Sequence, residues 1–97
     1  APPGAVQLKT IAGGPDYIDI SWINPQDSDV VSARVYTSLT AGTLGTSALK
    51  TNVSPGNESS ARLENLSNGR TYYITIRAID SDGLESADNT QYQATPL

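Results

Sequence analysis

The chain has 97 residues, a formal net charge of −4, six basic residues and neither cysteine nor histidine. This length fits one domain with one two-layer core, and the lack of cysteine excludes a disulfide framework and a thiolate metal site. The basic residues are scattered along the sequence, which argues against partners such as nucleic acid or anionic membranes, and no apolar run approaches the ~20 residues of a membrane helix. We expect a single domain over residues 1–97, with residues 1–4 as a stiff linker.

Alternating apolar and polar residues predict the first two strands. The first is expected over residues 6–11 and ends before the turn sequence of residues 13–16. Residues 18–22, Ile-Asp-Ile-Ser-Trp, alternate with the period of two that marks a half-buried strand. The sequence Asn24-Pro25 then ends the second strand, because proline has no N–H for the strand ladder.

A third strand is expected after the polar loop of residues 26–29. Its alternation places Val31, Ala33 and Val35 on one face and the residues between them on the other. The stretch of residues 35–49 carries no charge and is rich in Thr, Gly, Ser and Leu. We interpret it as the end of the third strand followed by a long, loosely ordered connection.

The second half of the chain repeats the pattern of strands and turns. A turn at residues 54–57 precedes a short strand around residues 61–63. After a tight turn at residues 66–69, the clearest strand of the sequence runs over residues 71–79, and a last strand is expected over residues 90–95. About seven short strands, with no window of helical periodicity, predict an all-β, seven-strand Greek-key sandwich.

Two motifs resemble those of fibronectin type III domains. Residues 18–22 resemble the second strand of that family, with Trp22 as its buried core tryptophan. The sequence Leu-Ser-Asn-Gly-Arg-Thr-Tyr at residues 66–72 is similar to the Leu-x-x-Gly-x-x-Tyr turn of the family, in which the tyrosine hydroxyl bonds back to the turn. The resemblance implies an immunoglobulin-like sandwich. The residues with an implied structural role are Trp22, Leu66, Gly69 and Tyr72.

The resemblance covers essentially the whole chain and also bears on function. The segments at residues 24–29 and 68–86 look prokaryotic or viral, and such domains occur in secreted bacterial polysaccharide-degrading enzymes, surface proteins and phage tails. The integrin-binding Arg-Gly-Asp and the Trp-Ser repeat of cytokine receptors are both absent. The implied role is a non-catalytic spacer in a larger secreted, cell-surface or virion protein, whose targeting segment would lie outside this sequence. Its partners would be flanking domains of the same polypeptide and, through weak contacts, polysaccharide or protein.

The alternation also predicts which side chains form the core. The expected core residues are Ile18, Ile20, Trp22, Val35, Leu63, Leu66, Tyr72, Ile74 and Ile76.

The sequence offers no catalytic constellation. Without histidine and cysteine, the usual general base and the strongest nucleophile are missing. Lys9 and Lys50 lie in no motif that would suggest a Ser-Lys pair. We therefore expect no catalytic residues, no enzymatic activity and no cofactor, and zinc is disfavoured for lack of its usual ligands.

Calcium is the metal that the sequence leaves open. Asp27 and Asp29 lie in the loop after the second strand, and Asp80, Asp82 and Glu85 lie in the loop after the sixth. In this topology the two loops lie at the same end of the sandwich, where oxygen ligands could converge on Ca²⁺ and stiffen an interdomain joint. The alternative, which we favour, is that these residues are ordinary turn formers whose side chains bond their own backbone.

Two tyrosines are candidates for ligand binding. Tyr73 points away from the core in the alternation, and Tyr36 follows the inward Val35 on a neighbouring strand. The two rings could form a platform for a sugar or a partner protein. The alternative, which we favour, is a cross-strand aromatic pair that stabilises the sheet.

Overall fold

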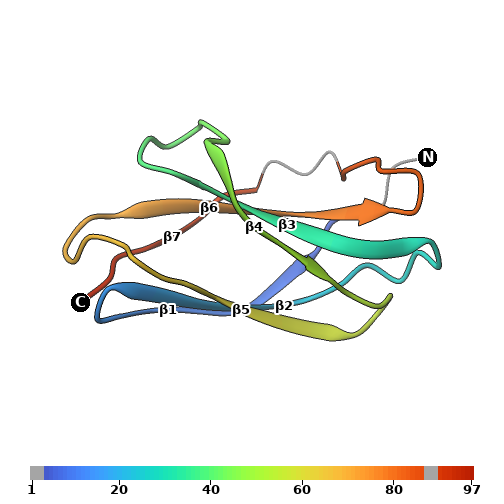
Figure 1. Ribbon diagram of the computed structural model, residues 1–97, viewed down its shortest axis with the longest axis horizontal. Coiled ribbons are helices and arrows are strands. Elements are labelled where there is room, and N and C mark those ends of the chain that lie inside the picture. The colour runs from blue at the N-terminus through green and yellow to red at the C-terminus, as the bar shows by residue number, and fades with distance from the viewer. Residues whose placement is uncertain (1–3, 87–89) are drawn as a thin grey trace.

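The computed structural model describes residues 4–86 and 90–97, which form a sandwich of two antiparallel sheets (Figure 1). The three-stranded sheet has the order β1-β2-β5 and consists of β1 (Gln7–Gly14), β2 (Tyr17–Ile23) and β5 (Glu58–Leu63). The four-stranded sheet has the order β4-β3-β6-β7 and consists of β3 (Val30–Ser38), β4 (Thr46–Asn52), β6 (Tyr72–Asp80) and β7 (Tyr92–Ala94). The predicted all-β, seven-strand sandwich is confirmed. Among the described residues there is no helix that could span a membrane, and most of the predicted linker lies outside them.

The core lies between the two sheets and is filled by the inward side chains of β2, β3 and β6. Seven of the nine predicted core residues are buried, and Leu66 and Tyr72 are partly buried against them. Trp22 is fully buried, and the inward alternation of its strand puts Ile18 and Ile20 on the same side. A single layer of such side chains between two sheets is what a chain of this length can bury.

The indole of Trp22 is anchored by a buried amide at the end of β2. Its Nε1–H donates to Oδ1 of Asn24 at 2.7 Å. The Asn24 amide nitrogen in turn donates to the backbone oxygen of Asn57 at 2.8 Å and to Oγ of Ser59 at 2.9 Å. Asn24 therefore joins the core tryptophan to the turn that precedes β5, in addition to marking the end of β2.

The turn before β6 is closed by the hydroxyl of Tyr72. This oxygen accepts a hydrogen bond from the Ser67 backbone N–H at 2.9 Å, which is the contact that the turn motif implies. Gly69 has a φ of +77°, a left-handed conformation that glycine adopts without steric cost. Its N–H donates to the backbone oxygen of Pro96 at 2.8 Å, so the turn also holds the exit of the chain.

The alternation predicted for the third strand is wrong at its start. A register shift between Val30 and Ser32 interrupts the pairing of β3 with β6. As a result Val30 and Ser32 are buried, whereas Val31 is 46% exposed. A β-bulge inserts one residue and moves the next side chain to the other face, which a strict period of two does not anticipate.

Residues 35–49 do contain the predicted end of the third strand, but the long, loosely ordered connection predicted to follow it is wrong. β3 continues to Ser38, β4 begins at Thr46, and only residues 39–45 connect them. This connection is fixed to the residue just before β7, because the Gln91 side chain accepts from the Gly42 N–H at 2.8 Å and donates to the Thr43 oxygen at 2.7 Å. β4 is an edge strand that buries little, so its sequence lacks the apolar alternation that would have revealed it.

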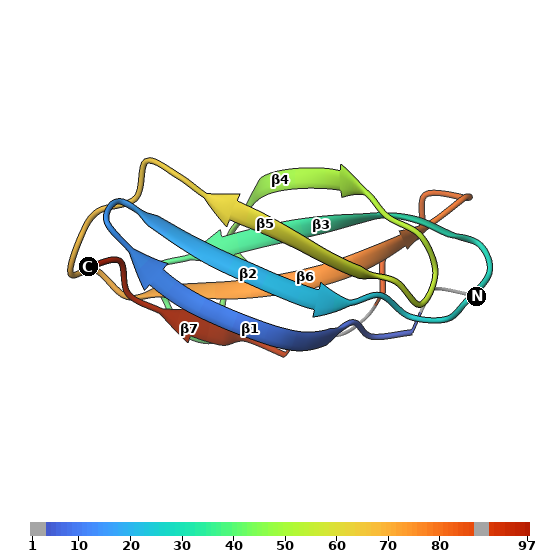
Figure 2. The same ribbon diagram turned by 90° about the horizontal axis from the view of Figure 1, so that it is seen from below.

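The chain enters at one end of the sandwich and leaves at the other (Figure 2). Near the entry, the Gly4 N–H donates to Oδ2 of Asp27, in the loop after β2, at 2.6 Å. At the exit, the Leu97 N–H donates to the oxygen of Gly14, the last residue of β1, at 3.0 Å. The longest dimension of the molecule is 39 Å, so β2 and its neighbours separate the entry from the exit.

Candidate functional site

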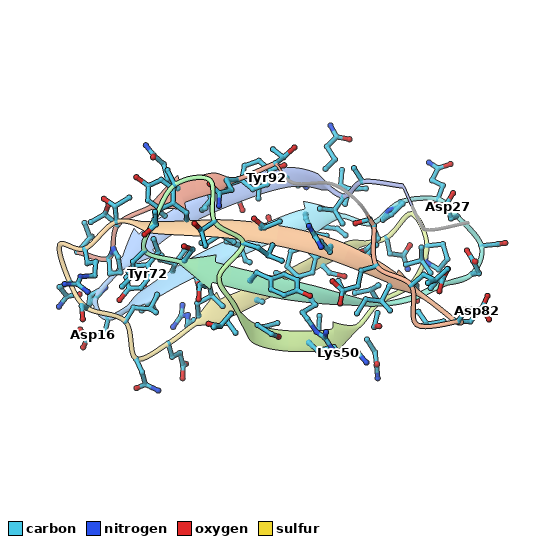
Figure 3. All side chains as sticks on the ribbon, turned by 90° about the horizontal axis from the view of Figure 1, so that it is seen from above. Asp16, Asp27, Lys50, Tyr72, Asp82 and Tyr92 are labelled. Carbon is cyan, nitrogen blue, oxygen red and sulfur yellow. The ribbon has the colours of Figure 1, made fainter. Side chains whose placement is uncertain are left out.

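The acidic loops meet at the entry end of the sandwich, where Figure 3 labels Asp27 and Asp82. Ser81 N–H donates to the backbone oxygen of Asp29 at 2.9 Å, which joins the two loops. Asp80 is 2% exposed, and its Oδ1 accepts from the N–H groups of Asp82 and Leu84, both at 2.9 Å. Asp80 thus caps its own turn.

Calcium at this end stays a prediction. Within residues 4–86 and 90–97, no three Asp or Glu side chains are grouped so that they could hold a metal ion. Glu85 leaves the acidic end altogether and reaches the outer face of the four-stranded sheet, where it contacts Arg34.

Three basic side chains lie abreast on the outer face of the four-stranded sheet. Arg34 on β3 is directly opposite Lys50 on β4 and directly opposite Arg77 on β6. Their neighbours Val35 and Ile76 are buried in the core, so alternation turns the basic residues outward. Figure 3 looks onto this face and shows Lys50 at its β4 side. We name Lys50, Arg34 and Arg77 the cation row.

Glu85 and Tyr36 form a hydrogen-bonded group with the middle of the cation row. Glu85 Oε2 lies 2.9 Å from Nη1 of Arg34, and the Tyr36 hydroxyl donates to Glu85 Oε1 at 2.5 Å. The guanidinium carbon of Arg77 lies 5.7 Å from the centroid of the Tyr36 ring, within cation–π range. One carboxylate therefore holds both an arginine and a tyrosine in place.

The same contacts set the protonation of this group. Burial raises the pKa of the Tyr36 hydroxyl, and the bond to Glu85 raises it further, while Arg34 opposes the shift. The pKa of Arg34 is raised, first by its contact with the Tyr36 hydroxyl and then by Glu85. At neutral pH Tyr36 is therefore a proton donor and Arg34 is a cation.

The two candidate tyrosines lie on this face but not opposite each other. Tyr36 faces Thr75 across the strand pair, and Tyr73 faces Ser38, so the two tyrosines are offset by two residues along the strands. Both are only partly exposed. Ligand binding by Tyr36 and Tyr73 stays a prediction, and the cation row beside them is a feature that sequence reading missed.

A hollow of about 310 Å³ opens beside Thr75, the cross-strand partner of Tyr36. It is lined by Gly42, Leu44, Thr75 and Gln91. Thr75 is 1% exposed, and it lines the hollow together with Gly42 and Leu44 of the connection at residues 39–45. The hollow adds hydroxyl, amide and backbone groups to the cations and the ring.

On the outer face of the three-stranded sheet, cations are paired with carboxylates. Arg62 donates to both carboxylate oxygens of Asp19, at 2.7 and 3.0 Å, and its guanidinium lies 3.9 Å from the Tyr17 ring centroid. The bond from Arg62 lowers the pKa of Asp19. Lys9 lies 2.5 Å from a carboxylate oxygen of Glu58. Each of these cations has its own carboxylate.

Comparison with known proteins identifies the family. The family model of the fibronectin type III domain matches residues 1–93. The chain belongs to the fibronectin type III family. No match to a curated protein was found. The family match confirms the resemblance that two sequence motifs carry.

This fibronectin type III domain also resembles parts of larger enzymes of known structure. It covers 28% of the spore cortex lytic enzyme SleM of Clostridium perfringens (97% of this chain, TM-score 0.74, 20% identity). It covers 13% of a beta-1,2-glucanase from Parabacteroides distasonis (100% of this chain, TM-score 0.78, 24% identity). It also matches an Fn3-like protein from Clostridium thermocellum (100% of this chain, 96% of that one, TM-score 0.72, 14% identity). At these identities the likeness shows the fold alone, and the chain spans under a third of either enzyme.

Proposed function

We propose that this domain is a non-catalytic module of a larger extracellular protein and that it holds neighbouring domains at a fixed separation. The observation that carries the proposal is the position of the two chain ends, which are tied to opposite ends of a body 39 Å long. A rigid insert of this kind separates its neighbours more reproducibly than a flexible linker, whose ends fluctuate.

The exit is suited to fixing the direction of the next domain. The backbone oxygen of Pro96 accepts from Gly69, and the N–H of Leu97 donates to Gly14, so the last two residues bond to the turn before β6 and to the end of β1. Pro96 is also buried. The backbone is therefore hydrogen-bonded to the domain as far as Leu97, and this would fix the direction in which the chain continues into a following domain.

The similar structures support a modular role. In SleM and the glucanase the matching region is a minor part of a longer chain. Fold alone does not assign function, but the lack of histidine and cysteine removes the common catalytic groups from this chain. We therefore expect purified protein to turn over no polysaccharide substrate.

A distance measurement tests the spacer role. The chain has no cysteine, so it can be fused between two cysteine-free folded domains, each of which carries one introduced and spin-labelled cysteine. Pulsed electron spin resonance on this fusion should give a narrow distribution of distances between the two labels. A Gly-Ser linker in place of this domain serves as the control. Equally broad distributions for both fusions would contradict the proposal.

A further inference from the structure

The turn before β6 carries the one Asn-Gly pair of the sequence, Asn68-Gly69. A backbone nitrogen can attack the side-chain amide of the asparagine that precedes it, and glycine allows this most readily because it has no Cβ to hinder the approach. The other asparagines are followed by proline, which has no N–H, or by residues that carry a Cβ. Both residues of the pair are exposed, so water reaches them. Asn68 is therefore the asparagine of this chain with the highest intrinsic tendency to deamidate.

Deamidation of Asn68 would proceed in two steps. Once the Gly69 N–H has lost its proton to water or hydroxide, the nitrogen forms a bond with Cγ of Asn68, the bond from Cγ to Nδ2 breaks, and ammonia leaves. Water then opens the resulting succinimide ring at one of its two carbonyl carbons. One opening gives aspartate, and the other gives isoaspartate, in which the backbone runs through the former side chain and is one methylene longer. Both products carry one more negative charge than asparagine.

The folded turn engages both reacting groups in hydrogen bonds. The Gly69 N–H, which must lose its proton, donates to the backbone oxygen of Pro96 at 2.8 Å. Oδ1 of Asn68, on the amide that must turn toward that nitrogen, accepts from the Asp16 N–H at 2.8 Å. The attack on Cγ requires both bonds to break, and one of them is made by the exit of the chain, which lies beside this turn (Figure 2).

We propose that Asn68 is a deamidation site that the folded exit protects, and that release of the exit starts its conversion. Pro96 is buried and the Leu97 N–H is bonded to Gly14, so the oxygen that faces Gly69 keeps its place while the domain is intact. Local opening of a chain end takes less free energy than unfolding of the core. Fraying or tension at the exit would therefore free Gly69 before the sandwich unfolds. This inference concerns the chemistry of one turn and does not rest on the spacer role.

Of the two products, isoaspartate breaks the protecting bond. Its extra methylene lies between positions 68 and 69, so it shifts the Gly69 N–H away from the Pro96 oxygen. The aspartate product leaves the backbone unchanged, and its carboxylate can still accept from the Asp16 N–H. Conversion of Asn68 to isoaspartate would therefore make the release of the exit permanent.

The first test compares the folded and the unfolded chain. The protein is kept at mildly alkaline pH and body temperature, with or without guanidinium chloride, and tandem mass spectrometry of its peptides locates the converted asparagines over several weeks. In denaturant, Asn68 should convert before Asn52, Asn57 and Asn65. In the folded protein, its conversion should be slower by at least about tenfold. Equal rates in the two states, or no preference for Asn68 in the unfolded chain, would overturn the proposal.

The second test loosens the exit without changing the Asn-Gly pair. Pro96→Gly keeps the backbone oxygen but frees the chain that presents it, and it should speed conversion of Asn68 in the folded protein by roughly fivefold. The matched control is Pro55→Gly, the same change in a turn at the entry end, which should leave the rate within about twofold. Circular dichroism confirms that the variants are folded, and Pro96→Ala replaces Pro96→Gly if the glycine variant is not. Equal acceleration by the exit and entry variants would mean that Asn68 is reached by unfolding of the whole domain, which would overturn the proposal.

The third test asks whether the modification releases the exit. The isoaspartate form is separated chromatographically from aged protein and compared with Asn68→Asp, which stands for the aspartate product. Hydrogen exchange of the Gly69 and Leu97 amides, followed by NMR, should be at least about fivefold faster in the isoaspartate form. Equal exchange in the two forms would remove the link between the modification and the exit. The spin-label distances are measured on fresh protein, so the spacer role is judged separately.

Discussion

The outer faces of the two sheets deal with charge in opposite ways. On the three-stranded sheet, Arg62 is paired with Asp19 and Lys9 with Glu58, so charge is cancelled where it stands. On the four-stranded sheet, the cation row sets three like charges side by side, and Glu85 bonds Arg34, the middle member. The two faces share one core and one fold. The contrast is one of register, because the first face places each cation beside a carboxylate and the second places cations beside one another.

The largest expected effect comes from removing Trp22, because both sheets pack on it and neither outer face can form without the core. Trp22→Ala should lower the free energy of unfolding by about 3–5 kcal/mol, because it empties the core and leaves the buried Asn24 without its indole partner. Urea unfolding followed by far-ultraviolet circular dichroism measures the loss. If the alanine variant does not fold, Trp22→Phe, which keeps most of the volume, gives a smaller measurable loss. A loss below about 1 kcal/mol for Trp22→Ala would contradict the assignment of Trp22 to a shared core.

A smaller loss should follow from opening the turn before β6. Tyr72→Phe deletes the hydroxyl that accepts from Ser67 and should cost about 1 kcal/mol. Tyr73→Phe, one residue further on the outer face, serves as the matched control and should cost less. The comparison is made by thermal unfolding of the two variants in the same buffer. Equal costs would remove the special role of the Tyr72 hydroxyl.

The stabilising contacts on the two outer faces should be lost at opposite extremes of pH. Those of Tyr36 on the four-stranded sheet should be lost at high pH. The pKa of Tyr36 is raised in the folded protein, so its contribution to stability is complete below the unfolded pKa of about 10 and is lost as pH rises through the folded pKa. Tyr36→Phe should therefore be less stable than the natural protein at neutral pH and should narrow that gap above about pH 10. Urea midpoints across this range measure the gap. A constant gap would contradict the hydrogen-bonded group at Glu85.

The smallest expected effect is on the three-stranded sheet, where the stabilising contribution of Asp19 should be lost at low pH. The pKa of Asp19 is lowered by the bond from Arg62, so its contribution is present above the unfolded pKa of about 3.9 and is lost as pH falls through the folded pKa. Asp19→Asn should reduce stability slightly at neutral pH and should match the natural protein in strong acid. Carbon-13 NMR titration of the Asp19 carboxyl gives the pKa directly. A value at or above about 3.9 would contradict the pairing.

The parts of the fold that could be predicted are those whose pattern lies within one short segment of the sequence. The alternation around Trp22 and the spacing from Leu66 to Tyr72 lie within single segments, so their patterns survive in the sequence. The bulge at Val31 was missed because an inserted residue leaves no mark in an alternating pattern. β4 was missed because an edge strand needs no apolar face.

The cation row could not be predicted for a different reason. Its members are far apart in the sequence and become neighbours only through the register of β4, β3 and β6. Taken singly, Lys50 and Arg77 look like scattered surface charges. A shift of one residue in either pairing would send one partner to the opposite face. Tyr36 and Tyr73 were correctly placed on neighbouring strands, since adjacency follows from topology, whereas their partners depend on register.

The most direct test of the contrast between the two faces is to remove one charge from each face and compare the urea midpoints. Arg62→Gln should lower the midpoint because it breaks the pair with Asp19, whereas Lys50→Gln should leave the midpoint unchanged or raise it, because Lys50 lies directly opposite the like charge of Arg34. An equal loss of stability in both variants would contradict the account.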